Sequence, residues 1–423
     1  KQNSTSLLLR LVEENPESQQ DIATAGPMAD LIGLLKEGSD GAKRFALWSL
    51  SLSINESNQK QLLEEGAIDP LVDTLNSTVP ASRQQAAAAI SRLANKNSKT
   101  QLEVAKKGGI TPLIAIVNGV EGPGGTSPTE VAAAAATASV GSNSSVDNGG
   151  EAGGGVRKAS RRPSLMVADH ATSDIEAKQY AAAALAALAS LPKVGKEIVD
   201  SGGLEPLVAL LNGGDNLGKQ YAAASLARLA TRGPKAPAAL EPAKAISAIQ
   251  PLVTLLTGDC GDKAQEEAAG ALFALADEVN NRIAITDAGG IGPLVTLLGS
   301  SNSESQKHAK GVLVRLSIES ANRALIIKKL VDMLGGSSSE GSSAQEQAAA
   351  ALANLASDSA ENRVSIVDAG GIEPLLSIIG HKENSKAKEE SLKAISKLAY
   401  NSESIQSAIT QAGGIPLLVN AMA

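Results

Sequence analysis

The phrase GGITPLI, which begins at Gly108, decides how this chain folds, because variants of it recur along the sequence. The other copies are GAIDPLV at Gly66, GGLEPLV at Gly202, GGIGPLV at Gly289, GGIEPLL at Gly370 and the shorter GGIPLLV at Gly413. Gly66 and Gly108 are 42 residues apart, and Gly370 and Gly413 are 43 apart. A period near 42 residues indicates an array of structural repeats that fold by stacking on their neighbours.

One unit, residues 361–400, shows how the phrase divides the chain. A short helix over 362–368 ends before Gly370, because glycine accepts the left-handed conformation that closes a helix. Pro374 then lies in the first turn of a second helix, where its missing N–H costs nothing. After a polar loop, apolar spacing predicts a longer third helix over 387–400. The pattern therefore predicts three helices per unit.

Two phrases resemble the armadillo-repeat family: N-R-x-x-I-x-x-A-G-G-I-x-P-L-L and QEQAAAALANLA at 345–356. The resemblance covers nearly the whole chain outside one insertion. HEAT repeats are the nearest competing fold, but they have two helices per unit and lack the Gly-Gly turn. It implies an all-α, right-handed α-solenoid, or superhelix, with three helices per unit. We expect armadillo repeats at 1–117 with a partial first unit, an insertion loop rich in Gly, Ser and Ala at 118–173, and repeats at 174–423 with a partial last unit.

Two units depart from the pattern. Around Pro234 to Pro251 the Gly-Gly turn is absent, and prolines are expected to interrupt the first helix. Near Ile326 to Leu334 the turn has collapsed to IIKKLVDML. We expect both places to alter the twist of the stack.

In armadillo proteins the third helices line a concave groove, and an asparagine in A-L-x-N-L-A faces a bound extended peptide. Only Asn354 matches that asparagine here. Alignment on the same phrase places other residues at this ladder position: Arg10, Arg92, Ala187, Arg228, Ala274, Arg315 and Lys397. Helix periodicity puts residues seven positions earlier on nearly the same face, among them Tyr180, Tyr221, His308 and Gln347. Four positions earlier most residues are Ala or Gly, which would let a peptide backbone approach.

Five of the eight ladder positions are cationic. We therefore predict a basic groove that binds an extended, acidic segment of a partner protein. The alternative is that each arginine pairs with an acidic side chain of the adjacent unit. Importin alpha carries repeated tryptophans in an acidic groove, whereas this chain has one tryptophan, Trp48. The resemblance is therefore closer to beta-catenin-like or to vacuolar and ciliary armadillo proteins.

Composition excludes several classes of protein. The formal net charge of −7 argues against a general nucleic-acid binder. No apolar run is long enough to span a bilayer. Only three histidines occur, and neither they nor the lone Cys260 lie at catalytic or metal-ligand spacing. We therefore expect no enzymatic activity, no cofactor and no metal, while a segment preceding Lys1 is expected to have carried further signals or a domain.

The insertion contains a basic stretch, RKASRRPSL, with Ser160 and Ser164. Arg161 and Arg162 precede Ser164 as in sites for basophilic kinases, so we consider both serines as phosphorylation sites. The alternative is an unregulated loop.

Together these patterns predict a non-catalytic, cytoplasmic scaffold or adaptor that holds a partner segment within a multi-protein complex. The alternative is a permanent structural component of a cytoskeletal (ciliary or flagellar) or membrane-associated assembly, contacting its partners through outer and end surfaces.

Overall fold

In the computed structural model the described residues are 28–54, 59–119, 165–231, 240, 242–335, 341–380 and 385–421. Every regular element in these ranges is an α-helix, which confirms the predicted all-α class. Arg10, Ser160 and Ser164 lie outside them. The chain divides into two compact units, Lys1–Ser225 and Leu226–Ala423, and each is described by itself.

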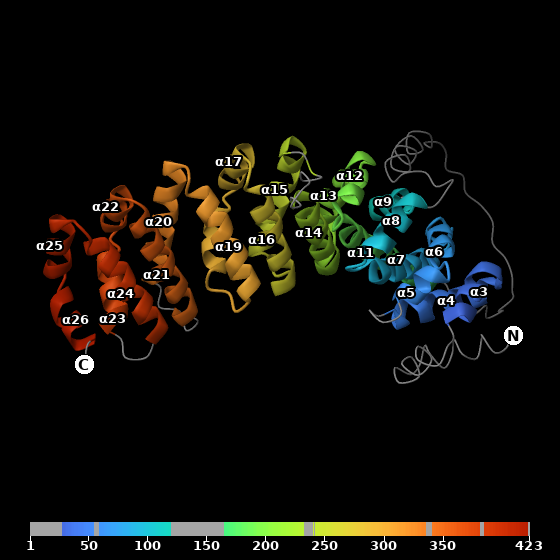
Figure 1. The fold of residues 1–423 in the computed structure, drawn as a ribbon, viewed down its shortest axis with the longest axis horizontal. Helices are drawn as coiled ribbons and strands as arrows, with labels where there is room; N and C mark the ends of the chain where they lie inside the picture. Colours follow the sequence, from blue (N-terminus) through green and yellow to red (C-terminus); the bar gives the residue numbers. More distant parts are fainter. Residues whose placement is uncertain are drawn as a thin grey trace, which may run out of the picture. The chain divides into compact units, whose positions relative to one another are not determined.

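The first unit is a stack of three-helix repeats (Figure 1). Its helices are α3 (Met28–Glu37), α4 (Asp40–Ser53), α5 (Gln59–Glu64), α6 (Ile68–Leu75), α7 (Pro80–Ala94), α8 (Ser98–Lys106), α9 (Ile110–Asn118), α11 (Leu165–Ala189), α12 (Pro192–Asp200), α13 (Leu204–Gly213) and most of α14 (Asn216–Ala230). The third helices α4, α7 and α11 pack on one another in this order. Helix α11 begins at Leu165, before residue 174, where the repeats are expected to resume.

The second unit continues the same order of helices. It contains α15 (Pro242–Thr257), α16 (Asp262–Leu275), α17 (Val279–Asp287), α18 (Ile291–Leu297), α19 (Ser303–Leu316), α20 (Ser320–Leu334), α21 (Gly341–Asp358), α22 (Ala360–Asp368), α23 (Ile372–Gly380), α24 (Ser385–Ala399), α25 (Glu403–Gln411) and α26 (Gly414–Ala421). The third helices of this unit are α16, α19, α21 and α24. Their predicted three-helix spacing is confirmed wherever a Gly-Gly turn is present.

The glycine pair is required at both of its positions. The first glycine of each copy is left-handed, with φ between 75° and 79° at Gly66, Gly108, Gly202, Gly289, Gly370 and Gly413. The second glycine has no room for a side chain, since a Cβ at Gly109 would lie 2.7 Å from Val104 Cγ1 and one at Gly371 would lie 2.8 Å from Ile366 Cγ2. In the degenerate copy the second residue is Ala67, and the residue five positions earlier is Leu62, which is not β-branched. The side chain that opposes the turn therefore decides whether alanine is tolerated.

The two units that lack the Gly-Gly turn form continuous helices instead. Helix α20 runs without interruption over the collapsed turn. Helix α15 likewise runs through the missing turn and contains Pro251 inside it. The prolines expected to interrupt the first helix around residue 234 fall outside the described ranges.

Amides from first helices hold the ends of the third helices in place. Asn281 Nδ2 donates to the carbonyl of Leu275 at 3.1 Å, and Asn362 Nδ2 donates to that of Leu355 at 2.8 Å. Gln101 Nε2 donates to the carbonyl of Ala94 at 2.9 Å. These bonds satisfy carbonyls that a helix end leaves without an intrahelical partner. They fix the last turn of each third helix, which carries the ladder position.

Candidate functional site: the face of the third helices

The ladder position falls in the last turn of the third helices. Arg92 lies there in α7, Arg315 in α19 and Lys397 in α24. A cation at a helix C-terminus is stabilised by the helix dipole with no ligand present. The availability of each cation therefore depends on its neighbours.

In the first unit, three of the predicted site residues act on one another. Tyr221 on α14 is half-buried, and burial raises the pKa of its phenol above the ordinary value. The neighbouring Tyr180 on α11 raises this pKa further, while the positive charge of Arg92 on α7 lowers it. The structure therefore brings together side chains from three successive third helices.

The polar groups of this cluster are available to a ligand. Among the described residues, neither the Arg92 guanidinium nor the Tyr180 and Tyr221 hydroxyls have a hydrogen bond or an ion pair. The main-chain carbonyls of Arg92 and Tyr221 do accept bonds, from Gln59 and Ser225 respectively. Guanidinium and phenol groups are hydrogen-bond donors, so the surface suits a group rich in acceptors.

Arg315 in the second unit is already paired within the protein. Its Nε lies 2.7 Å from Asp277 Oδ1, and its guanidinium stacks 3.7 Å from the centroid of the Phe273 ring. Both partners come from the preceding third-helix segment. Asp277 lies 38 residues before Arg315 in the sequence. At Arg315 the structure therefore agrees with the alternative interpretation, in which the arginine pairs with an acidic side chain of the adjacent unit. The sequence pattern missed Phe273, although it is one of only two phenylalanines in the chain.

The small residues beneath this part of the face do not leave open space. A Cβ on Gly270 would lie 3.2 Å from His308 Cε1, and one on Gly311 would lie 2.3 Å from Phe273 Cε2. The His308 and Phe273 rings lie 5.9 Å apart between their centroids. The prediction that these glycines admit a peptide backbone is therefore wrong for the α16–α19 pair, because the protein's own rings occupy the space.

The remaining predicted residues differ in exposure. Arg228 is half-buried on α14 and has a partner of its own. Gln347 is half-buried, whereas Asn354 and Lys397 are exposed. Asn354 also lines a cavity between α19 and α21. The structure thus leaves several ladder residues accessible without gathering all of them into one uniform basic surface.

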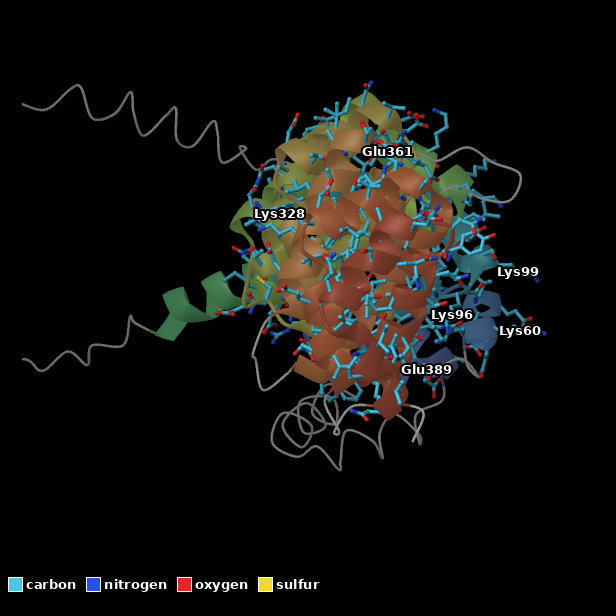
Figure 2. The ribbon with its side chains drawn as sticks, turned by 90° about the vertical axis from the view of Figure 1, so that its left-hand side faces the viewer. Lys60, Lys96, Lys99, Lys328, Glu361 and Glu389 are labelled. Carbon is cyan, nitrogen blue, oxygen red and sulfur yellow. The ribbon has the colours of Figure 1, made fainter. Side chains whose placement is uncertain are left out.

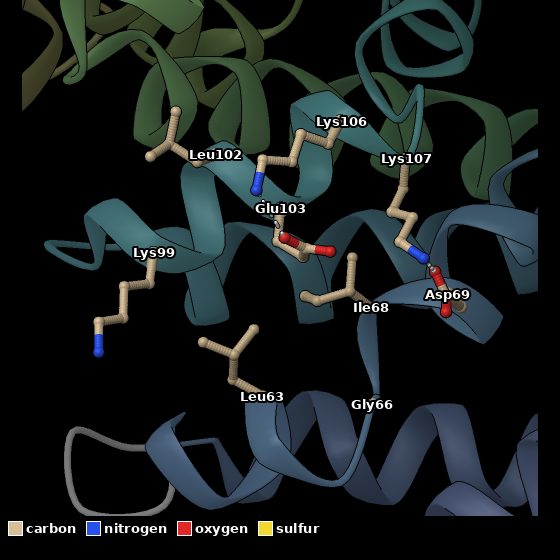
Figure 3. A pocket seen from close by; sticks show the side chains of 9 residues that line it. All are labelled: Leu63, Gly66, Ile68, Asp69, Lys99, Leu102, Glu103, Lys106 and Lys107. Carbon is tan, nitrogen blue, oxygen red and sulfur yellow. Dashed lines mark hydrogen bonds and ion pairs between the residues drawn. The ribbon is translucent and has the colours of Figure 1, made fainter.

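A group of lysines in the first unit lies away from the third helices. A cavity of about 380 Å³ is lined by residues of α5, α6 and α8, among them Lys99 and Lys106 (Figure 3). Lys107 Nζ lies 2.7 Å from Asp69 Oδ1, and this hydrogen bond raises the pKa of Lys107. Lys106 lies 3.4 Å from Glu103. Most of the positive charge around the cavity is therefore compensated.

Other lysines of the first unit are fully solvated. Lys60, Lys96 and Lys99 point outward on one side of the unit (Figure 2). Lys60 forms only an exposed pair with Glu64, at 3.6 Å. Exposed pairs of this kind contribute little to stability.

The described ranges contain no group of three or more histidine, cysteine or carboxylate side chains placed to hold a metal ion. No helix within them is long and apolar enough to cross a membrane.

Comparison with known proteins places these features in context. Residues 55–95, which include α5, α6 and α7, match the family model of the Armadillo/beta-catenin-like repeat. The comparison with curated proteins finds no match. Among solved structures, the chain is similar to an engineered protein at 26% identity, with 70% of this chain and 100% of that chain covered and a TM-score of 0.51.

Two further solved structures are similar over most of their length. A second engineered protein shares 29% identity, with 93% of each chain covered and a TM-score of 0.49. A designed armadillo repeat protein in complex with the peptide (KR)4 shares 21% identity, with 69% of this chain and 100% of that chain covered and a TM-score of 0.49.

Proposed function

We propose that this chain, of which residues 55–95 match the Armadillo/beta-catenin-like repeat, is a non-catalytic interaction scaffold whose third-helix face binds an extended, acidic segment of a partner protein. The observation that carries the proposal is that Arg92, Tyr180 and Tyr221, on three third helices of the first unit, are partly exposed and have no side-chain partner among the described residues. These side chains come from α7, α11 and α14, so a ligand that contacts all three must cross several third helices.

The chemistry of this cluster favours carboxylates. A charge-assisted hydrogen bond from arginine to a carboxylate contributes about 1.5–3 kcal/mol, and phenol hydroxyls add neutral donors. The half-buried position of Tyr221 excludes part of the surrounding water, which strengthens such contacts. An acidic side chain is therefore a better match than a basic one.

An extended conformation of the ligand suits the spacing of the third helices. Packed helices lie about 8–10 Å apart, and an extended chain advances about 3.3 Å per residue. Each repeat would then meet about three ligand residues. A segment of this kind can contact successive repeats without folding itself.

The second unit contributes to this proposal through fewer cations than the sequence predicts. Arg315 is held by Asp277 and Phe273, so we exclude it from the proposed contacts. Lys397 is exposed at the equivalent position of α24 and stays in the proposal. Within the second unit, the proposed basic contacts are therefore fewer than the sequence predicts.

Fluorescence anisotropy with two labelled peptides tests the proposal on the full chain. An Asp-Ser repeat peptide should bind, and a Lys-Ser repeat peptide of equal length should bind more weakly. Arg92→Ala should weaken binding of the acidic peptide about tenfold, the loss expected for one charge-assisted hydrogen bond. Added salt should weaken the complex further.

Lys106→Ala is the matched control, because it also removes one cation from the first unit but lies on α8, away from the third helices. It should change the affinity less than about twofold, as expected for an exposed charge. Equal losses in the two variants, or tighter binding of the basic peptide, would overturn the proposal.

The alternative of a structural component in a cytoskeletal or membrane-associated assembly makes a different prediction. Its contacts would use the outer and end surfaces, so Arg92→Ala would leave the native complex intact in a pull-down from cell extract. We place the scaffold in the cytoplasm as part of the same proposal.

A further inference from the structure

Helices α19 and α21 are the third helices of successive repeats in the second unit. Helices α16 and α19 pack along each other, as do α21 and α24. In the part of the second unit that the structure describes, α19 and α21 pack less extensively on each other, and α20 packs mainly on α21. A cavity of about 70 Å³ lies between α19 and α21.

The inner wall of this cavity is apolar. Side chains from four helical segments line it: Leu298, Leu313, Ile326, Leu330, Ala351 and Leu355. Leu313, Ile326 and Leu330 are buried, so the wall is fixed by the core of the unit. The volume is about half of the ~150 Å³ cavity that holds a benzene molecule, which suits one aliphatic side chain.

Exposed apolar residues continue from the cavity to the surface. Val314, which lines the cavity, is 60% exposed, and Ile318 one turn further along is 64% exposed. Large apolar side chains that adjoin a cavity and face solvent mark an interaction site more often than isolated ones do.

The rim carries polar groups that are available to a ligand. Lys310 stands on the α19 side, and Asn354 and Asp358 stand on the α21 side. Among the described residues, none of these three side chains has a hydrogen bond or an ion pair. The Asn354 amide can donate and accept at once, as the main chain of an extended peptide requires.

We propose that the cavity between α19 and α21 binds one leucine- or isoleucine-sized side chain of an extended partner segment that carries an acidic residue beside it. The acidic residue would pair with Lys310, and the partner main chain would bond to Asn354. The inference rests on the proposed function and adds an apolar anchor to the acidic segment. The ladder position of Asn354 makes the cavity continuous with the face that carries Lys397 in the same unit.

Two labelled peptides that differ at one residue test the anchor on the full chain. One is an Asp-Ser repeat peptide with a single central leucine, and the other has alanine in place of that leucine. The leucine peptide should bind about tenfold more tightly, because its extra methylene groups leave water. Ala351→Phe places a ring in the cavity and should remove this preference, so that the two peptides bind the variant with equal affinity.

Ala324→Phe is the matched control, since Ala324 is exposed on α20 and does not line the cavity, and it should retain the leucine preference. Val314→Ser, at an exposed rim position, provides a variant that leaves the core intact and should reduce the preference about threefold. Equal affinities of the natural chain for the two peptides would overturn the proposed anchor site. If the alanine peptide still binds in an Arg92-dependent way, the proposed function remains valid without the anchor site. If neither peptide binds, the proposed function and the anchor site both fail.

Discussion

Arg92 in the first unit and Arg315 in the second occupy the same position of the repeat but differ in what surrounds them. Arg92 has no side-chain partner among the described residues and acts on the nearby Tyr221. Arg315 is bound to Asp277 and stacked on Phe273. The position in the repeat therefore fixes where a cation stands, whereas the preceding third helix decides whether it is available to a ligand.

The same contrast extends to the small residues four positions before the ladder position. In the second unit, Phe273 and His308 fill the space above Gly311 and Gly270. The Phe273 ring stacks against Arg315, and the two rings together close this part of the face. A closed segment and an open one are thus built from the same repeat.

The largest effect should come from Gly311→Ala, which tests whether the closed segment is tightly packed. The new Cβ would lie 2.3 Å and 2.5 Å from two atoms of the Phe273 ring, so the ring or the helix must shift. Overpacking of this kind costs about 1–3 kcal/mol of unfolding free energy. Urea denaturation measures the loss. Gly292→Ala is the control, because nothing lies within 4 Å of its Cβ, and it should leave stability unchanged or raise it.

Removing the two arginines should affect stability differently. Arg315→Ala removes an ion pair and a cation–π contact, which together contribute about 1 kcal/mol. Arg92→Ala removes neither and should change the unfolding free energy by less than about 0.5 kcal/mol. Thermal denaturation of both variants checks the difference. Equal destabilisation would show that Arg92 is held as firmly as Arg315.

A smaller effect should appear in the titration of Tyr221. Its folded-state pKa is raised by burial and by Tyr180, and the Arg92 charge opposes this rise. Arg92→Ala should therefore raise the pKa of Tyr221 further, as measured by phenolate absorbance against a Tyr221→Phe reference. An unchanged or lower pKa in the variant would show that Arg92 lies too far away to act on the cluster.

The raised pKa of Tyr221 also has a consequence for stability. Because the folded state holds the proton more tightly than the unfolded chain, this contribution is complete below the unfolded pKa of about 10. It is lost as the pH rises through the folded pKa.

The smallest effect should come from the exposed pair of Lys107 and Asp69, which serves as a reference for a paired cation away from the third helices. The hydrogen bond raises the pKa of Lys107, so its stabilisation is present below the unfolded pKa of about 10.4 and disappears as the pH rises through the folded value. Asp69→Asn should be slightly less stable than the natural chain at neutral pH. The difference should vanish in strongly alkaline solution, and a difference that persists there would have another cause.

Much of the fold could be predicted from local patterns. The left-handed glycines and the position of the ladder residues follow from the conformational preferences of short segments. The start of α11 at Leu165 could not be placed, because a Gly-, Ser- and Ala-rich composition carries no clear boundary. The candidate site was predicted as a list of positions, and only some of them proved accessible.

The sequence by itself determined that the chain is an array of three-helix repeats and which residues stand in the last turn of each third helix. These properties depend on each residue's own backbone preferences and on helix periodicity, which act within a few residues. Tertiary structure decided that Arg315 is neutralised while Arg92 is not, and that α19 and α21 stand apart around an apolar cavity. Both depend on side chains from other repeats, whose approach is set by packing and is not visible in the local pattern of the sequence.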